Sequence, residues 1–100
     1  MPTILITAPP EAGDDLARLL VEERLAACVN RIDCQSTYRW EGTIREEPET
    51  ILLAKTEPGH VADLVDVVEA KHPYDTPCIE RFEEDVLVRA YEQWREETTL

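Results

Sequence analysis

The sequence predicts an α+β protein with a single β-sheet, and three of its features carry that prediction. Residues 28–40 alternate between apolar or aromatic residues at most even positions and polar residues at most odd positions, a period of two that indicates a long strand. Residues 3–8 and 49–56 have apolar side chains on both faces, which is typical of central strands. Apolar residues at helical spacing occupy the segments between these strands.

The ends of the elements follow from proline and glycine. Pro9-Pro10 ends the first strand, and Pro73 ends a helix because the residue before a proline disfavours helical ψ. Glu41-Gly42 lets the long strand fold back as a hairpin, since glycine takes positive φ without steric cost. We expect an interruption of the returning strand at residues 46–48. The expected elements are strands over residues 3–8, 28–40, 43–56 and 77–82, and helices over residues 14–26 and 58–71 and around residues 87–94.

The resulting order is βαββαβ with a long hairpin between the second and third strands and a helix at the C-terminus. This is the ferredoxin-like pattern of the α+β class, and residues 1–100 form one domain. Right-handed crossovers place both main helices on the same face of the sheet. The second face of strands 3–8 and 49–56 is also apolar, and the most economical cover is another copy of the chain. The pattern therefore predicts a homo-oligomer.

The composition excludes several classes of function. A net charge of −12 argues against nucleic acid, whose phosphates require clustered Lys and Arg. No segment approaches the roughly 18 apolar residues of a membrane span. The chain has no Ser-His-Asp pattern, no zinc-protease helix and only three glycines, too few for a phosphate-binding glycine loop, so we expect no enzyme.

Charge and cysteine content indicate the environment of the protein. Eight Arg and two Lys oppose 22 Asp and Glu, a balance that suggests adaptation to high salt, where self-repulsion is screened. The alternative is an ordinary solvated acidic surface. The N-terminus lacks the features of a signal peptide, so we expect the cytoplasm. Three cysteines, an odd number, argue against a disulfide framework.

Four segments in register resemble one family, the CutA divalent-cation-tolerance proteins. They are Glu-Arg-Leu-Ala-Ala-Cys-Val-Asn at 23–30, Tyr-Arg-Trp-Glu-Gly at 38–42, Leu-Leu-Ala-Lys-Thr at 52–56 and His-Pro-Tyr-Asp-Thr-Pro at 72–77. The resemblance covers nearly the whole chain. It implies a ferredoxin-like subunit in a tight homotrimer with the sheets around the threefold axis. It also implies a role in metal-ion tolerance, with copper as the usual ligand.

Two residues match family positions that can bind metal. Cys28 is the cysteine of the Ala-Ala-Cys motif, and its thiolate suits Cu(I), although a small buried hydrophobic residue is the alternative. His72 belongs to the His-Pro-Tyr motif and could bind Cu(II) or Zn(II), or cap the end of a helix. Some relatives carry a cysteine in the first strand and a histidine before His-Pro-Tyr, but the corresponding places here hold residues such as Ile6 and Lys71, which argues against a multidentate copper site.

Aromatic residues and a carboxylate predict a second candidate site. Tyr38, Trp40, Glu41 and Tyr74 could form a cleft between subunits that holds a small molecule or ion. Alternatively, the aromatic rings only pack the hairpin against the neighbouring subunit.

The leading interpretation is a cytoplasmic, non-catalytic homotrimer for divalent-metal tolerance. We expect it to bind copper or another divalent ion and to bind neither nucleic acid nor membranes. The rival interpretation is a signalling or scaffold trimer that resembles the nitrogen-regulatory PII proteins and holds a small ligand in its inter-subunit clefts. Nucleotide binding in such clefts uses basic residues, of which this chain has few.

Overall fold

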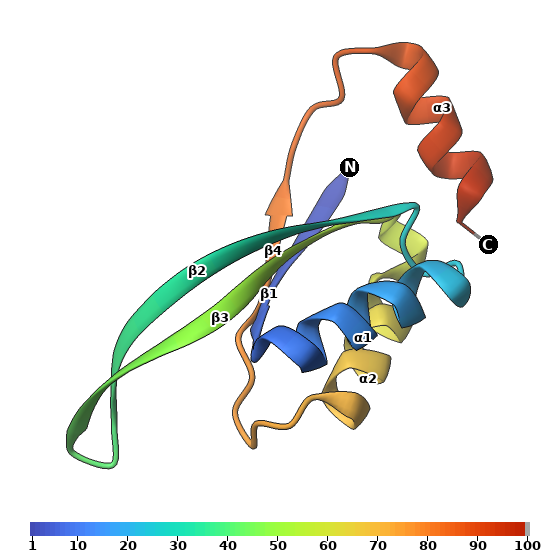
Figure 1. Cartoon of the computed structure of the whole chain (residues 1–100). Helices are drawn as coiled ribbons and strands as arrows, with labels where there is room; N and C mark the ends of the chain where they lie inside the picture. The colour runs from blue at the N-terminus through green and yellow to red at the C-terminus, as the bar shows by residue number, and fades with distance from the viewer. Residues whose placement is uncertain (100) are drawn as a thin grey trace.

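A computed structural model describes residues 1–99 and confirms the predicted α+β fold (Figure 1). Its four strands form one antiparallel sheet in the order β2-β3-β1-β4. The elements are β1 Pro2–Ala8, α1 Pro10–Glu22, β2 Cys28–Trp40, β3 Thr43–Lys55, the short 3-10 helix Pro58–His60, α2 Val61–Lys71, β4 Ile79–Glu83 and α3 Arg89–Thr98.

The hairpin of β2 and β3 extends well beyond the rest of the sheet. Its pairing runs from Cys28 opposite Lys55 to Trp40 opposite Thr43, whereas β1 ends opposite Thr50. The turn residues Glu41 and Gly42 have φ of 50° and 75°, the positive values that a two-residue hairpin turn requires. The free end of the hairpin therefore has only two strands (Figure 1).

Several details of the elements differ from those that the sequence predicts. β3 is continuous through Pro48, which pairs with Gln35. Strand β1 pairs with β3 only as far as Thr50, so at Pro48 the strand β3 has a neighbour on one side only. A strand edge tolerates proline, which has no N–H to donate. Helix α1 begins at Pro10 rather than at Asp14, because a proline preset to helical φ suits the first helical turn. The helix also ends earlier, before Arg24, whose φ is 58°.

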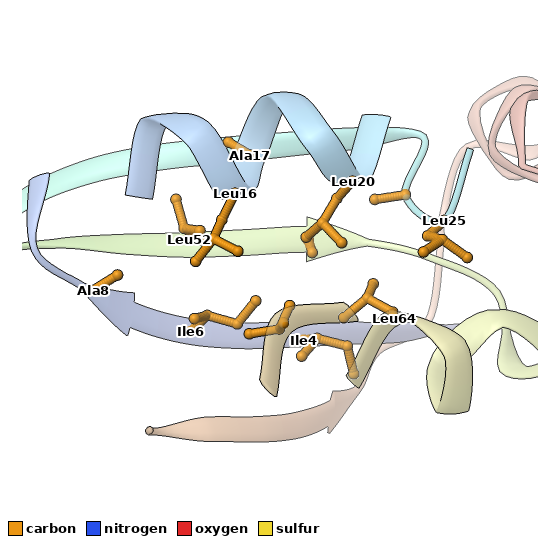
Figure 2. Close-up of a cluster of buried hydrophobic side chains, with 12 residues drawn as sticks. Ile4, Ile6, Ala8, Leu16, Ala17, Leu20, Leu25, Leu52 and Leu64 are labelled. Carbon is orange, nitrogen blue, oxygen red and sulfur yellow. The ribbon is translucent and has the colours of Figure 1, made fainter. Parts of the chain in front are cut away.

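Helices α1 and α2 cover the same face of the sheet, as right-handed crossovers predict (Figure 2). Leucines of α1 and residues of α2 close over the even-numbered side chains of β1 and β3. The fully buried members are Ile4, Ile6, Ala8, Leu20, Leu52, Ala54, Leu64 and Val68. This face of the sheet and the two helices form the hydrophobic core.

The opposite face of the sheet, which we call the helix-free face, is not covered by a helix (Figure 1). Side chains alternate along a strand, so the register places the odd positions of β1 and β3 and the even positions of β2 and β4 here. Its apolar members are Leu5, Ile32, Ile51, Leu53 and Phe82. Ile32 is 47% exposed and Phe82 is 51% exposed. The apolar alternation of β2 thus lies on the face without helices.

The C-terminal helix α3 contacts the domain mainly through a polar residue. Leu87, Tyr91 and Trp94, which have helical spacing in the sequence, are 92%, 39% and 44% exposed in the single chain, and Leu87 lies before the first residue of α3. Instead Arg95, which is 1% exposed, donates hydrogen bonds to the carbonyl oxygen of Thr56 at 3.1 Å, to the carbonyl oxygen of Pro2 and to Glu84 at 2.8 Å. Within residues 1–99, none of the helices is long and apolar enough to cross a membrane.

Candidate functional site

A groove of about 620 Å³ lies on the helix-free face, where the hairpin meets the loop between α2 and β4. Its wall on the hairpin side comes from β2 and β3, and its other wall from residues 73–78. The lining residues are Thr7, Ser36, Thr37, Tyr38, Trp40, Arg45, Glu47, Glu49, Pro73, Tyr74, Asp75, Thr76 and Cys78. The groove therefore combines aromatic rings with carboxylates.

Two tyrosine–glutamate pairs define the polar part of the groove. The hydroxyl of Tyr38 donates to Oε2 of Glu47 at 3.0 Å, and the hydroxyl of Tyr74 donates to Oε2 of Glu49 at 3.0 Å. Burial, followed by the hydrogen bond to its glutamate, raises the pKa of each tyrosine. Glu49 is only 6% exposed although it lines the groove. Both tyrosines thus remain neutral and hold carboxylates in place.

His72 fixes one wall of the groove. The residue is 8% exposed, and its Nε2 lies 2.8 Å from the carbonyl oxygen of Thr7, to which it donates. Its Nδ1 accepts a hydrogen bond from the backbone N–H of Tyr74 at 3.1 Å, and the rings of His72 and Tyr74 are 4.9 Å apart. Nε2 therefore ties His72 to β1 and Nδ1 holds the loop that follows, so a metal ion could reach either ring nitrogen only by displacing a hydrogen bond.

Cys28 lies at the far end of the sheet from His72. It is half-buried on the helix-free face, with its Sγ 3.9 Å from Oδ1 of Asn30. Cys28 pairs with Lys55, and Lys55 pairs with Thr3 on β1. Thr3 is four residues from Thr7, or about 13 Å along the strand. One subunit therefore does not bring Cys28 and His72 together.

The other cysteines do not complete a metal site. Cys34 is half-buried and lies 3.8 Å from the hydroxyl of Ser36. Cys78 lines the groove, and burial together with its hydrogen bond to Glu80 raises the pKa of its thiol. In the described chain, no group of three or more His, Cys, Asp or Glu residues is arranged to hold a metal ion.

The predicted cleft residues divide into two groups. Tyr38, Trp40 and Tyr74 come together in the groove. Glu41 does not line it, because this exposed residue occupies the hairpin turn. The sequence interpretation missed Glu49, which supplies a buried carboxylate, and Glu47, which supplies a half-buried one.

Strand register was the signal that could have identified the two glutamates. Counting back from the turn pairs Ser36 with Glu47 and Cys34 with Glu49. Cross-strand partners share one face of a sheet, and Ser36, Cys34 and Tyr38 have the same parity. The two glutamates therefore belong to the face of Tyr38.

The sheet, its long hairpin, one layer of helices and the C-terminal helix define the class of the protein. It is the ferredoxin-like fold of the CutA and PII-like type. Residues 3–98 match the family model described as CutA1 divalent ion tolerance protein, and the chain belongs to the CutA family. This is a family of tolerance proteins rather than of enzymes, as the sequence predicts.

Individual relatives support the assignment over almost the full chain. The divalent-cation tolerance protein CutA of Thermus thermophilus is 42% identical over 98 residues, which cover 96% of this chain and 95% of the relative. The PII-like protein CutA of a Nostoc species, solved in its apo form, has a TM-score of 0.94 and 34% identity, with 100% and 98% of the two chains covered. The CutA of Archaeoglobus fulgidus, described as periplasmic, has a TM-score of 0.92 and 37% identity, with 98% of each chain covered.

Proposed function

We propose that this protein is a homotrimer that acts in divalent-metal tolerance and binds copper without catalysis. The observation that carries the proposal is the apolar helix-free face of the sheet. Exposed apolar side chains that gather on one face mark an interaction site, and a second copy of the same chain is the most economical cover. Family membership supports the tolerance role, because matching relatives bear that name.

Two further segments favour assembly. The free end of the hairpin exposes Trp40 and Ile44 at 42% and 60%, and α3 exposes Tyr91 and Trp94. These side chains lie at opposite ends of the elongated subunit, which measures 46 Å along its longest axis. Strands and helices that extend from the domain can reach neighbouring copies. The resemblance to the family, with its sheets arranged around a threefold axis, makes three the proposed number of copies.

We propose Cys28 and His72 as the metal-binding residues, with Cys28 as the primary ligand of Cu(I). The thiol lies half-buried on the helix-free face, where a thiolate and a soft monovalent ion suit each other. His72 would join only after giving up its hydrogen bond to Thr7 or to Tyr74. Cys28 and His72 lie far apart within one subunit. An ion bound by both residues would therefore have to lie between two subunits.

Copper titration of single variants tests this site. Competition with a Cu(I) chelator under reducing conditions should show a loss of affinity of at least about tenfold for Cys28→Ala, because the thiolate is the only soft ligand proposed. Cys34→Ala, which removes a thiol from the same strand and face, is the matched control. His72→Ala should also weaken binding, and its melting temperature must be measured beside its affinity. Affinities equal to that of the wild type would remove these residues from the site.

We propose a cytoplasmic location. Its support is three free cysteines, Cys28, Cys34 and Cys78, since free thiols persist in reducing compartments. The Archaeoglobus fulgidus relative described as periplasmic makes the question open to experiment. Fractionation of the native host with an antibody against this protein should recover it with cytoplasmic markers. Recovery in another compartment would refute the proposal.

The groove favours a second candidate function, that of a PII-like trimer that holds a small ligand. The supporting observation is a concave site of about 620 Å³ in which aromatic rings and fixed carboxylates converge. The likeness to the PII-like protein CutA of Nostoc supports it further. A thermal-shift screen with metals and small molecules separates the two functions, because only a ligand of the folded state raises its stability.

A further inference from the structure

We propose that the groove binds a small organic cation, such as a quaternary ammonium or an amine, between its tyrosine rings and its two glutamates. This inference rests on the second candidate function, a ligand in the groove, and adds the chemical class of that ligand. Three properties of the groove lead to it, namely its charge, its aromatic walls and a buried carboxylate.

The charge of the groove favours cations over anions. Three carboxylates line it, those of Glu47, Glu49 and Asp75, against one guanidinium, that of Arg45. A second copy that closed over the groove would itself carry a net charge of −12. Phosphate groups require clustered basic side chains, so a nucleotide does not fit this environment.

The buried carboxylate of Glu49 is held by a hydrogen bond at one oxygen and leaves the other oxygen available to a ligand. Tyr74 holds Oε2 of Glu49, and Tyr38 holds Oε2 of Glu47. Among residues 1–99, no hydrogen bond engages Oε1 of either carboxylate. Glu49 is 6% exposed, and its Oε1 keeps contact with solvent, so a ligand in the groove can reach a carboxylate that is otherwise largely shielded from water. A ligand that brings a positive charge would supply the missing partner.

The walls of the groove select an organic cation rather than a bare metal ion. Tyr38, Trp40 and Tyr74 line it, and aromatic faces attract ammonium groups by cation–π interaction. Three carboxylates line the groove, but in the described chain no group of three His, Cys, Asp or Glu residues is arranged to hold a metal ion, whereas Ca²⁺ takes roughly six to eight oxygen ligands. The volume of about 620 Å³ also fits a small molecule rather than an ion.

Choline and its neutral isostere 3,3-dimethylbutan-1-ol test the proposal, because they share a shape and differ in charge. The 100-residue chain carrying Trp94→Phe keeps Trp40, which lines the groove, as its single tryptophan. Its fluorescence reports binding at near-physiological salt. Choline should change this signal saturably, whereas the neutral isostere and inorganic phosphate should not.

Variants assign the effect to the groove. Glu49→Gln keeps the shape and an acceptor for Tyr74, and should weaken choline binding by about tenfold or more, because it removes the negative charge that faces the quaternary ammonium. Glu47→Gln serves as a second variant if Glu49→Gln does not fold. Glu69→Gln on the exposed side of α2 makes the same change in net charge and should leave binding unchanged.

Several results would overturn the proposal. Equal binding of the neutral isostere, unchanged affinity in both groove variants, or binding of Ca²⁺ in place of choline would each do so. The absence of a choline signal up to about 10 mM, tenfold above a millimolar Kd, would also refute it. Binding of the isostere or of phosphate would refute the cation but keep the groove as a ligand site, and the copper titration is unaffected by any of these results.

Discussion

Arg95→Ala should destabilise the fold strongly, because one buried guanidinium joins three separate segments. It donates to the carbonyl oxygens of Thr56 and Pro2 and to the carboxylate of Glu84. A hydrogen bond from a charged donor contributes roughly 1.5–3 kcal/mol, and truncating one partner of a buried ion pair costs about 3–5 kcal/mol. The Glu84 side chain is 34% exposed, so water can solvate its carboxylate once Arg95 is removed, and the lost ion pair costs less than a fully buried one. The hydrogen bonds to the carbonyl oxygens of Thr56 and Pro2 therefore contribute most, and we expect the free energy of unfolding to fall by about 3 kcal/mol.

Urea unfolding at a fixed protomer concentration measures this loss of free energy of unfolding, because the proposed assembly would link stability to concentration. The midpoint should fall with an unchanged slope. Arg95→Lys keeps the charge without the planar fork and should lose about half as much. Arg89→Ala, at an exposed position of the same helix, is the control. A loss under about 1 kcal/mol, or one equal to that of Arg89→Ala, would refute the reasoning.

Four further predictions concern packing, titration and salt. Gly13→Ala should cost about 1 kcal/mol despite its better helix propensity, because the added Cβ would lie 3.1 Å from Cβ of the buried Thr50; an increase in urea midpoint would contradict this. Burial raises the pKa of Glu57, so the folded state disfavours its charged form. Glu57→Gln should therefore raise the melting temperature at neutral pH, and the gain should vanish as the pH falls below the ordinary Glu pKa of about 4.3. A gain that persists at lower pH would argue against this cause. The raised pKa of Tyr74 means that stability should fall as the pH rises above about 10, where only the unfolded chain loses this proton; Tyr74→Phe should flatten that fall in denaturation curves. Finally, added salt should raise the melting temperature, since it screens a net charge of −12; no gain would speak against adaptation to high salt.

The fold was predictable because the strand and helix periods are regular and the turns carry specific residues. Glu41-Gly42 located the hairpin turn, and the βαββαβ order set the sheet. Pro10 was harder to interpret, because a proline after a strand serves equally as a strand end or as the first turn of a helix. Sequence pattern alone does not choose between these two uses.

The candidate site was only partly predictable. The aromatic members Tyr38, Trp40 and Tyr74 stood out by residue type, but their partners Glu47 and Glu49 belong to a chain with many acidic residues. Only strand register separates these two from the solvated majority. His72 illustrates a different limit, because its hydrogen bond to the carbonyl oxygen of Thr7, 65 residues away, leaves no trace in local composition.

The apolar residues of the C-terminal segment show why an apolar pattern does not identify what covers it. Leu87, Tyr91 and Trp94 have the spacing of a core-facing helix, yet all three are exposed in the single chain. Helical period predicts that a face is to be buried. It does not specify whether the partner surface belongs to the same chain or to another copy.

Sedimentation velocity of the purified protein at micromolar concentration tests the proposed assembly most directly. The apolar helix-free face requires a cover, and we expect one species with three times the 11.5 kDa mass of the chain. A well-folded species with the mass of one chain would contradict the trimer and any ligand site shared between subunits.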